Sequence, residues 1–408
     1  MAVAITPLSV SGRIEALDAI RGLAVMGMLL VNVQSFGMIE AAYINPTAYG
    51  DLTGINRSVW IWTHVLGDQK FITLFSLLFG AGIVLFTGRL ENKGTRPVRP
   101  FYRRMFWLFL LGLFHAYVLW HGDILVCYAI CGSIAYWLHS RSVKSLLAFG
   151  AILIAIPAFN FWLFGKSLEY WPKEALDGLL LSWNPGDEVI VAETEALRGG
   201  LLDQMRWRIP AAIKMQTFLF AIWFFWRTLG LMMWGMALYK LGMLRGAWPA
   251  WSYMLLTIAG LALGLPLILA GVERNFEAGW TVAYSMFFGW QYNYAGSIPL
   301  ALAYAALVGL FAIWRPASVF VRWMAPIGRM ALSNYIFMTL ICTFIFYGHG
   351  LGLFGTVERK QQVFIVLAIW VAVVLFSHLW LRYHTRGPLE RLWRRFTYDI
   401  SRSRPEST

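Results

Sequence analysis

Long apolar runs separated by short polar loops make up most of this chain. A helix needs about 20 apolar residues to cross the hydrocarbon core of a bilayer, and runs near this length recur from end to end. We predict helical spans at residues 20–38, 71–90, 105–120, 123–139, 143–164, 217–241, 251–271, 284–314, 330–347 and 363–381. The pattern therefore predicts an all-α polytopic membrane helix bundle with about ten transmembrane helices.

Composition supports a membrane protein. Of the 408 residues, 59% are hydrophobic and only 13% are charged, and the mean hydropathy is +0.60. In soluble domains, roughly a quarter of the residues are charged. The net charge of +13 does not point to nucleic acid, because the basic residues lie mostly in short loops between apolar runs. Such loops are typical of the cytoplasmic side of a membrane protein.

The distribution of basic residues predicts the orientation of the chain. The loop after the second span is the most basic and is predicted to be cytoplasmic, since it contains Arg89, Lys93, Arg96, Arg99, Arg103 and Arg104. Alternate threading of the other spans then places both termini in the cytoplasm. The same threading puts the His121–Gly122 turn and residues 165–213 outside.

Three parts follow from this threading. Residues 1–164 form an N-terminal five-helix half with the candidate catalytic residues, and residues 217–408 form a C-terminal five-helix half with a basic cytoplasmic tail. Residues 165–216 between them are predicted to be an external loop with short interfacial helices, which we interpret as a lid. Cys127, Cys131 and Cys342 lie in apolar runs, so we predict neither a disulfide framework nor a metal site.

A histidine and an aspartate flank one tight turn in the run LLGLFHAYVLWHGDILVCYAICG. His115 and Asp123 lie in the two predicted arms of this hairpin, and Tyr128 follows. Placing an ionisable residue in a membrane span costs about 2.5–3.5 kcal/mol on insertion scales. A carboxylate beside an imidazole fixes its tautomer and raises its basicity. The pair is therefore a candidate general base, with a purely structural buried histidine as the alternative.

A second candidate pair precedes the second span, in HVLGDQKFITLFSLLFGAG. His64 and Asp68 are four residues apart, and Lys70 follows. We expect all three at the outer surface, at the depth of Asp123 and within a site shared with His115. The alternative is a solvated surface. The portion FSLLFGAG is rich in small residues and predicts a close-packed helix face.

Polar residues also mark the cytoplasmic side. In LDAIRG, Asp18 and Arg21 are three residues apart and are predicted to pair on one helix face. Asn32 in the same span requires a polar partner. GRMALSNY brings Arg329, Asn334 and Tyr335 to this side, and RGPLERLWRRFT predicts a basic helix on the membrane surface.

The ordered motifs LDAIRG, AAYINPTAYG, KFITLFSLLFGAG, LLGLFHAYVLWHGDIL, GRMALSNYI and RGPLERLWR together resemble the YeiB-like family of bacterial inner-membrane proteins. The C-terminal part of that family is a domain of unknown function (DUF418). The family is in turn distantly similar to membrane acyltransferases such as heparan-α-glucosaminide N-acetyltransferase and the acyltransferase-3 proteins. In the heparan enzyme the catalytic histidine precedes the second span, where His64 and Asp68 stand here with a different spacing.

The resemblance implies an acyltransferase of the bacterial inner membrane that uses cytoplasmic acyl-CoA, first of all acetyl-CoA, as co-substrate. Its acceptor is expected to be a hydroxyl or amine at the outer face. In this interpretation Asp18, Arg21, Arg329, Asn334 and Tyr335 bind the CoA. His115 or His64 acts as base, oriented by Asp123 or Asp68. Asn32, Lys70 and Tyr128 contact the substrate, and Lys70 or Tyr128 stabilises the oxyanion.

The alternative function is a transporter or channel for a lipid, a peptide or a small metabolite, using the same intramembrane charges. We expect the lipid bilayer, the acyl donor and an envelope or small-molecule acceptor as partners, no nucleic acid, and a homodimer as a possible assembly.

Overall fold

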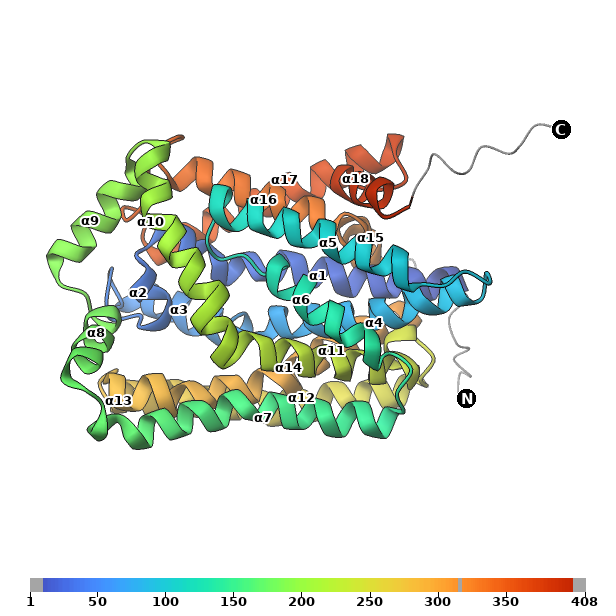
Figure 1. The fold of residues 1–408 in the computed structure, drawn as a ribbon, viewed down its shortest axis with the longest axis horizontal. Coiled ribbons are helices and arrows are strands. Elements are labelled where there is room, and N and C mark those ends of the chain that lie inside the picture. Colours follow the sequence, from blue (N-terminus) through green and yellow to red (C-terminus); the bar gives the residue numbers. More distant parts are fainter. Residues whose placement is uncertain (1–9, 315–317, 399–408) are drawn as a thin grey trace.

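The protein is a bundle of helices that share one long axis (Figure 1). The computed structural model describes residues 10–314 and 318–398, and every regular element in these ranges is a helix. Seven apolar helical stretches are long enough to cross a membrane: α1 (Val10–Gly37), α3 (Gly54–Leu66) with α4 (Lys70–Glu91), α7 (Val143–Ser167), α10 (Leu201–Lys214) with η4 (Met215–Phe224) and α11 (Phe225–Lys240), α12 (Ala250–Glu277), α13 (Val282–Tyr284) with η6 (Ser285–Gly289) and α14 (Trp290–Trp314), and α17 (Arg359–Tyr383). The predicted all-α membrane bundle is confirmed.

The other predicted spans are shorter or bent. Helices α15 (Val319–Arg329) and α16 (Ala331–Phe346) meet at 83° and form an eighth span if they are counted together. The hairpin around His115 consists of α5 (Val98–Phe114), the π-helix η1 (His115–Leu119) and α6 (Leu125–Ala135). Because α6 has only 11 residues, this hairpin falls short of the length of the seven long stretches, although about ten full crossings were expected.

The second span begins earlier than predicted. Helix α3 leads directly into α4, and the two form one apolar stretch of 38 residues from Gly54 to Glu91. Between them, Gln69 adopts a left-handed backbone with φ of 65°. The expected depth of His64, Asp68 and Lys70 at the outer side stays a prediction, but the alternative of a solvated surface is wrong for Lys70. They lie at the break inside this stretch, and Lys70 is fully buried.

Helix α1 runs through the middle of the bundle and contacts α4, α14, α15, α16 and α17 (Figure 1). Its closest approach is to α15. A Cβ on Gly22 would lie 2.1 Å from the carbonyl oxygen of Met324, and one on Gly328 would lie 1.8 Å from that of Asp18. Only glycine permits this contact between backbones. The contact brings Arg21 and Arg329, which are the chain neighbours of these glycines, to the same end of the bundle.

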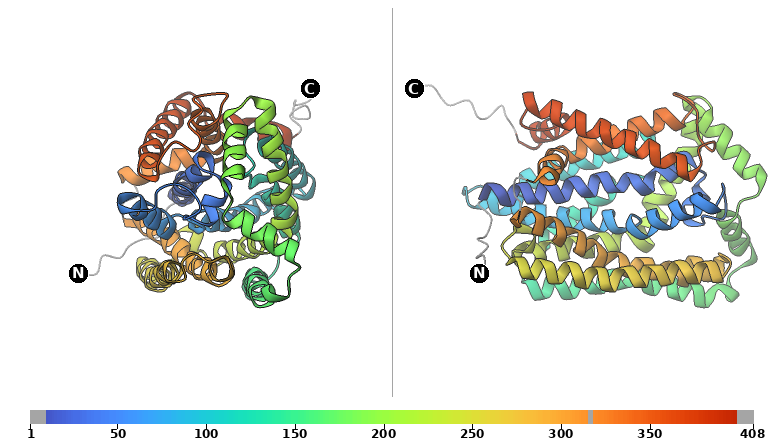
Figure 2. Two further views of the ribbon diagram at one scale, coloured as in Figure 1. Left: turned by 90° about the vertical axis from the view of Figure 1, so that its left-hand side faces the viewer. Right: turned by 180° about the vertical axis from the view of Figure 1, so that it is seen from behind.

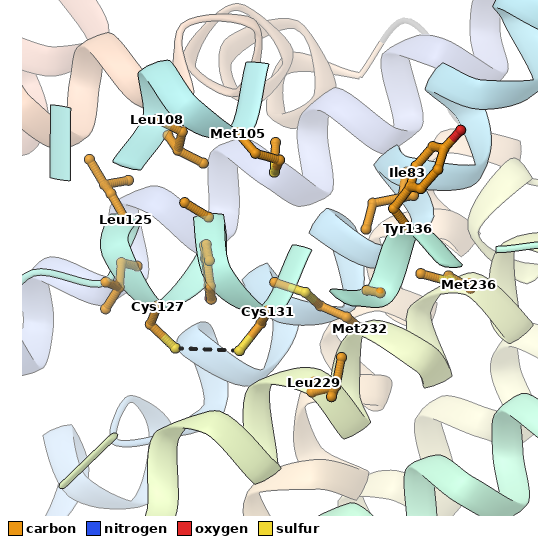
Figure 3. Close-up of a cluster of buried hydrophobic side chains, with 14 of the residues drawn as sticks. Ile83, Met105, Leu108, Leu125, Cys127, Cys131, Tyr136, Leu229, Met232 and Met236 are labelled. Carbon is orange, nitrogen blue, oxygen red and sulfur yellow. Dashed lines mark hydrogen bonds between the residues drawn. The ribbon is translucent and has the colours of Figure 1, made fainter. Parts of the chain in front are cut away.

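Helices α4 and α11 also touch through glycines. A Cβ on Gly80 would lie 1.9 Å from the carbonyl oxygen of Met232, and one on Gly235 the same distance from that of Leu77. The close-packed face predicted for FSLLFGAG is thereby confirmed. Helix α6 fills the space beside this contact, and Cys127 and Cys131 face Leu229 and Met232 in an apolar core (Figure 3). The two cysteines are free, with their sulfur atoms 3.9 Å apart.

A row of short helices covers the end of the bundle opposite to the start of α1. They are α8 (Lys173–Trp183), α9 (Asp187–Arg198) and the beginning of α10, and they lie across that end in Figure 2. The indole of Trp183 donates to the carbonyl of Trp280 at 2.8 Å. On α9, the buried Glu193 accepts the backbone N–H of Glu40 at 2.9 Å. The lid role of this segment stays a prediction.

The glycine contact between α4 and α11 gives a test of the packing. Replacing Gly80 by Ala forces the two backbones apart, because its Cβ would lie 1.9 Å from Met232. We expect Gly80→Ala to destabilise the protein by about 1–3 kcal/mol, as overpacking typically does. On the same helix, a Cβ added to Gly82 would meet nothing within 4 Å. Gly82→Ala is the matched control and should be neutral or slightly stabilising. Thermal unfolding in detergent measures both, and equal melting temperatures would contradict the contact.

Glu193 makes the docking of α9 dependent on pH. Burial, together with the neighbouring Glu40 carboxylate, raises the pKa of Glu193 from 4.5 to about 8. The folded protein therefore keeps this proton up to about pH 8, whereas the unfolded chain loses it near pH 4.5. Stability from this group is complete below pH 4.5 and falls as the pH rises to 8. We expect Glu193→Gln to reduce the loss of melting temperature between pH 5 and pH 9. The exposed Glu195 on the same helix supplies the control Glu195→Gln, and identical pH profiles for both variants would refute the assignment.

Candidate functional site

Three buried side chains, Asp123, His115 and Thr339, are linked by hydrogen bonds at the hairpin. Nδ1 of His115 lies 2.9 Å from Oδ1 of Asp123, and Nε2 lies 3.0 Å from Oγ1 of Thr339 on α16. The second carboxylate oxygen of Asp123 accepts the backbone N–H of Val126 at 2.9 Å, which caps the start of α6. An ionised Asp123 requires the proton on Nδ1, so neutral His115 has Nε2 as its acceptor. The predicted pairing of His115 with Asp123 is confirmed.

The local fold of the hairpin explains why these groups meet. Helix α5 widens into a π-helix at His115, a distortion frequently found at functional sites. Trp120 then leaves the helix in an extended conformation and stacks on Phe36 of α1, with ring centroids 4.2 Å apart. Arg208 of α10 is buried and donates to the backbone carbonyl of Val118. This carbonyl is at the end of η1, where carbonyls have no partner within the helix. The turn is thus fixed between α1 and α10.

A cavity of about 970 Å³ leads from the basic end of the bundle towards this hairpin. Its walls come from α1, α4, α5, α6, α15, α16 and α18 (Pro388–Thr397). Its inner part is apolar, with Met28, Phe75, Phe79, Met105 and Leu108 among the lining residues. We call it the mouth cavity. Its shape, a charged opening and an apolar interior, suits an anionic group that carries a long arm.

The opening of the mouth cavity is strongly cationic. Among the described residues, two acidic side chains, Asp18 and Glu390, line it, against seven basic ones: Arg21, Arg89, Lys93, Arg104, Arg329, Arg386 and Arg394. Asp18 pairs with Arg21 at 2.5 Å, as the LDAIRG spacing predicted. Glu390 bonds to the backbone N–H groups of Leu332 and Ser333 at the start of α16. The basic side chains of this lining therefore outnumber its carboxylates by a wide margin.

The closed end of the mouth cavity lies against the histidine. Tyr335 and Tyr128 line this end together with Ile124. The ring of Tyr335 stands next to that of His115, with centroids 4.9 Å apart. Tyr128 is hydrogen bonded to Ser76 at 2.9 Å. His115 itself is fully buried and does not line the cavity, so the Tyr335 ring separates it from the cavity space.

A second, much smaller cavity of about 20 Å³ lies on the other side of Ile124 and Tyr128. Asp123 lines it, together with Gln216 and Phe220 of η4. Its volume is close to that of a single water-sized probe. The cavity on the far side of Ile124 and Tyr128 from the mouth cavity therefore has room for about one water molecule.

The pair His64 and Asp68 belongs to a separate network. Nδ1 of His64 lies 3.3 Å from Asp68, and Asn293 of α14 donates to Asp68 at 2.7 Å. Lys70 donates to the backbone carbonyl of His64 at 2.7 Å and to Oδ1 of Asn293. None of these residues lines either cavity. Among the described residues, no hydrogen bond links this network to His115, so the structure does not unite the four residues in one hydrogen-bonded site.

Two other predicted contacts differ from expectation. Asn334 is fully buried and bonds to Ser377 at 2.9 Å and to the carbonyl of Ile327, so it fastens α16 to α17 and does not face the mouth cavity. Asn32 is half-buried on α1 and lines neither cavity. The partners of Asn334 come from α15 and α17, which sequence spacing alone does not reveal.

Sequence reasoning missed Thr339, Arg208 and Arg227. Thr339 is far from His115 in the chain, and threonine is common in membrane helices, so no signal marked it. Arg227 lies in the middle of an apolar run, and such an arginine is a recognisable signal of a buried partner. It is buried and donates to Thr73 at 2.9 Å and Ser297 at 2.7 Å.

Comparison with known proteins identifies the family of this chain. Residues 238–399 match the family described as "Protein of unknown function (DUF418)". The chain is 33% identical over 385 residues to "Uncharacterized protein YeiB" of Escherichia coli (strain K12), covering 93% of this chain and 95% of that protein. It is 29% identical to "Uncharacterized protein YxaH" of Bacillus subtilis (strain 168), with 96% of each chain covered. No solved structure matches. The chain therefore belongs to the YeiB-like family of DUF418 membrane proteins.

Proposed function

We propose that this protein is an acyltransferase of the bacterial inner membrane that moves an acyl group from acyl-CoA to a hydroxyl or amine acceptor. The observation that carries the proposal is the mouth cavity. It joins an opening with seven basic side chains to a closed end beside His115. The phosphates of CoA would bind at the basic end, which then faces the cytoplasm, through charge-assisted hydrogen bonds. Its pantetheine arm would extend along the cavity towards Tyr335.

The transfer step uses His115 as a general base. The acceptor hydroxyl replaces the hydroxyl of Thr339 at Nε2, and Nε2 takes its proton as the acceptor oxygen attacks the thioester carbonyl. A new C–O bond forms and the C–S bond breaks, and the CoA thiolate leaves with the proton that His115 returns. Asp123 keeps Nδ1 protonated and stabilises the imidazolium between the two proton transfers. An amine acceptor follows the same course with nitrogen in place of oxygen.

The pair at His64 is less suited to this role. Neither His64 nor Asp68 lines either cavity, whereas the neighbours of His115 do: Asp123 lines the small cavity, and Tyr335, whose ring packs against His115, lines the mouth cavity. The ammonium of Lys70 is already bonded to His64 and Asn293. A thioester in the mouth cavity would have no route to these groups through the described lining. We therefore assign the chemistry to His115 and Asp123, and a structural role to the network of His64.

Transport is the second candidate function, and one observation favours it. The network of Lys70, Asp68 and Asn293 lies at the break between α3 and α4, and ion and substrate sites of transporters are often built at interrupted helices. A transporter would move a substrate across liposomes without changing it chemically. Retention of such flux in a His115→Ala variant would favour transport over transfer.

Binding of acyl-CoA at the basic opening is directly testable. We expect acetyl-CoA to raise the melting temperature of the purified protein, and the double variant Arg21→Gln/Arg329→Gln to lose most of that shift. Two phosphate contacts would be removed, each contributing about 1.5–3 kcal/mol. Arg206 is an exposed arginine outside the cavity, so Arg206→Gln is the charge-matched control. A shift that survives in the double variant would place CoA elsewhere, and no shift in the wild type would refute the acyl-CoA proposal.

The His115–Asp123 pair should affect transfer much more than binding. We expect His115→Ala to keep the acetyl-CoA shift and to lose about 10²–10⁴-fold in transfer rate, the usual contribution of a general base. Asp123→Asn should lower the rate as well, and the double variant should be no slower than His115→Ala, because the two residues act as one unit. The assay follows release of free thiol from acetyl-CoA in the presence of a membrane extract as acceptor. Additive losses in the double variant would show that the pair does not act together.

A further inference from the structure

One buried phenol at the closed end of the mouth cavity has an unused proton. The side chain of Tyr335 is only 5% exposed, yet its hydroxyl donates no hydrogen bond to any described residue. The backbone N–H of Ile124 is directed at the phenol oxygen, but an N–H is itself a donor and leaves the phenolic proton available. Buried polar groups are nearly always hydrogen bonded, and an orphan in a native protein calls for a ligand or a water molecule.

The other groups proposed for carbonyl binding are already occupied. Tyr128 donates or accepts at Ser76 at 2.9 Å and approaches the carbonyl of Ile72 at 3.3 Å. Lys70 is bonded to His64 and Asn293 and does not line the cavity. Tyr335 differs from both, because it lines the cavity and stands beside His115.

We propose that the Tyr335 hydroxyl binds the carbonyl oxygen of the acyl group and stabilises the oxyanion that forms during transfer. This inference rests on the proposed function. The phenol donates a hydrogen bond and keeps its proton throughout. As the acceptor oxygen bonds to the carbonyl carbon, negative charge moves onto the carbonyl oxygen and strengthens this hydrogen bond. When the C–S bond breaks the carbonyl reforms, and the thiolate takes its proton from His115.

The position of Tyr335 on α16 makes the geometry workable. Thr339, whose hydroxyl lies 3.0 Å from Nε2 of His115, follows one turn later on the same helix, and the carbonyl of Tyr335 at 3.2 Å is the alternative acceptor for its single proton. One face of α16 thus presents both the Tyr335 hydroxyl, which would bind the acyl carbonyl, and the Thr339 hydroxyl, which the acceptor substrate would displace. The cavity behind Ile124 and Tyr128 has a volume of about 20 Å³, too little for the acyl arm to pass, so the thioester carbonyl stops at Tyr335.

The substitution Tyr335→Phe removes the hydroxyl and keeps the ring against His115. Because this hydroxyl donates no hydrogen bond, its removal should change the melting temperature little. The matched control is Tyr102→Phe on α5, because the Tyr102 hydroxyl donates to the carbonyl of Ser133 at 2.8 Å and Tyr102 lies outside the cavity lining. This control should lower the melting temperature. A fall as large as that of Tyr102→Phe would mean that the Tyr335 hydroxyl already donates a hydrogen bond, and would overturn the inference.

The ligand test compares acetyl-CoA with CoA, which lacks the acyl carbonyl. We expect Tyr335→Phe to bind CoA as the wild type does, to lose about 3–10-fold in affinity for acetyl-CoA, and to transfer about 10²–10³-fold more slowly. Tyr102→Phe should keep the wild-type ratio of the two affinities. An unchanged ratio and rate in Tyr335→Phe, while the wild type binds and transfers, would overturn the inference and leave the proposed function standing. If the wild type binds neither compound, the proposed function fails, and the comparison of melting temperatures still decides whether the hydroxyl is an orphan.

Discussion

The need to satisfy ionisable groups away from water is the constraint on which this structure depends. His115 and Asp123 are both buried among apolar helices, where a lone charge or an unpaired polar atom is strongly unfavourable. The hairpin resolves this locally, because its turn brings the two side chains within 2.9 Å. The remaining nitrogen of the histidine then requires a partner from outside the hairpin, and Thr339 of α16 supplies it. This single demand ties the N-terminal hairpin to the C-terminal half of the chain.

A second demand, close contact between backbones, organises the basic end. Gly22 and Gly328 let α1 and α15 touch, and this contact fixes Arg21 and Arg329 at one opening. The LDAIRG and GRMALSNY motifs thus depend on each other although they are more than three hundred residues apart. The Glu390 carboxylate bonds to the start of α16 and attaches α18 to the same place. Three motifs with no obvious common role in the sequence therefore build one cationic surface.

Local patterns predicted the features that are themselves local. The apolar runs predicted the helices, and the spacing of His115 and Asp123 across a turn predicted their hydrogen bond, because a helical hairpin has few ways to close. The burial of Lys70 and its bonds to His64 and Asn293 were not predictable in this way. They depend on the left-handed backbone at Gln69, where an amphipathic helix continues into an apolar one. Thr339 and the orphan hydroxyl of Tyr335 were also hidden, since both are defined by partners or their absence in three dimensions.

The two buried networks lie against different neighbours of α4, and this division separates their roles. Lys70 and Asp68 meet Asn293 of α14, and these three side chains satisfy one another within the protein. A closed network of this kind holds helices together but has little left to offer a ligand. At the other network, the satisfied pair of His115 and Asp123 stands beside an unsatisfied phenol at the end of a large cavity. The mouth cavity beside Tyr335 distinguishes this hairpin from the break between α3 and α4, where Gln69 also has an unpaired buried oxygen but neither it nor His64, Asp68 and Lys70 lines either cavity.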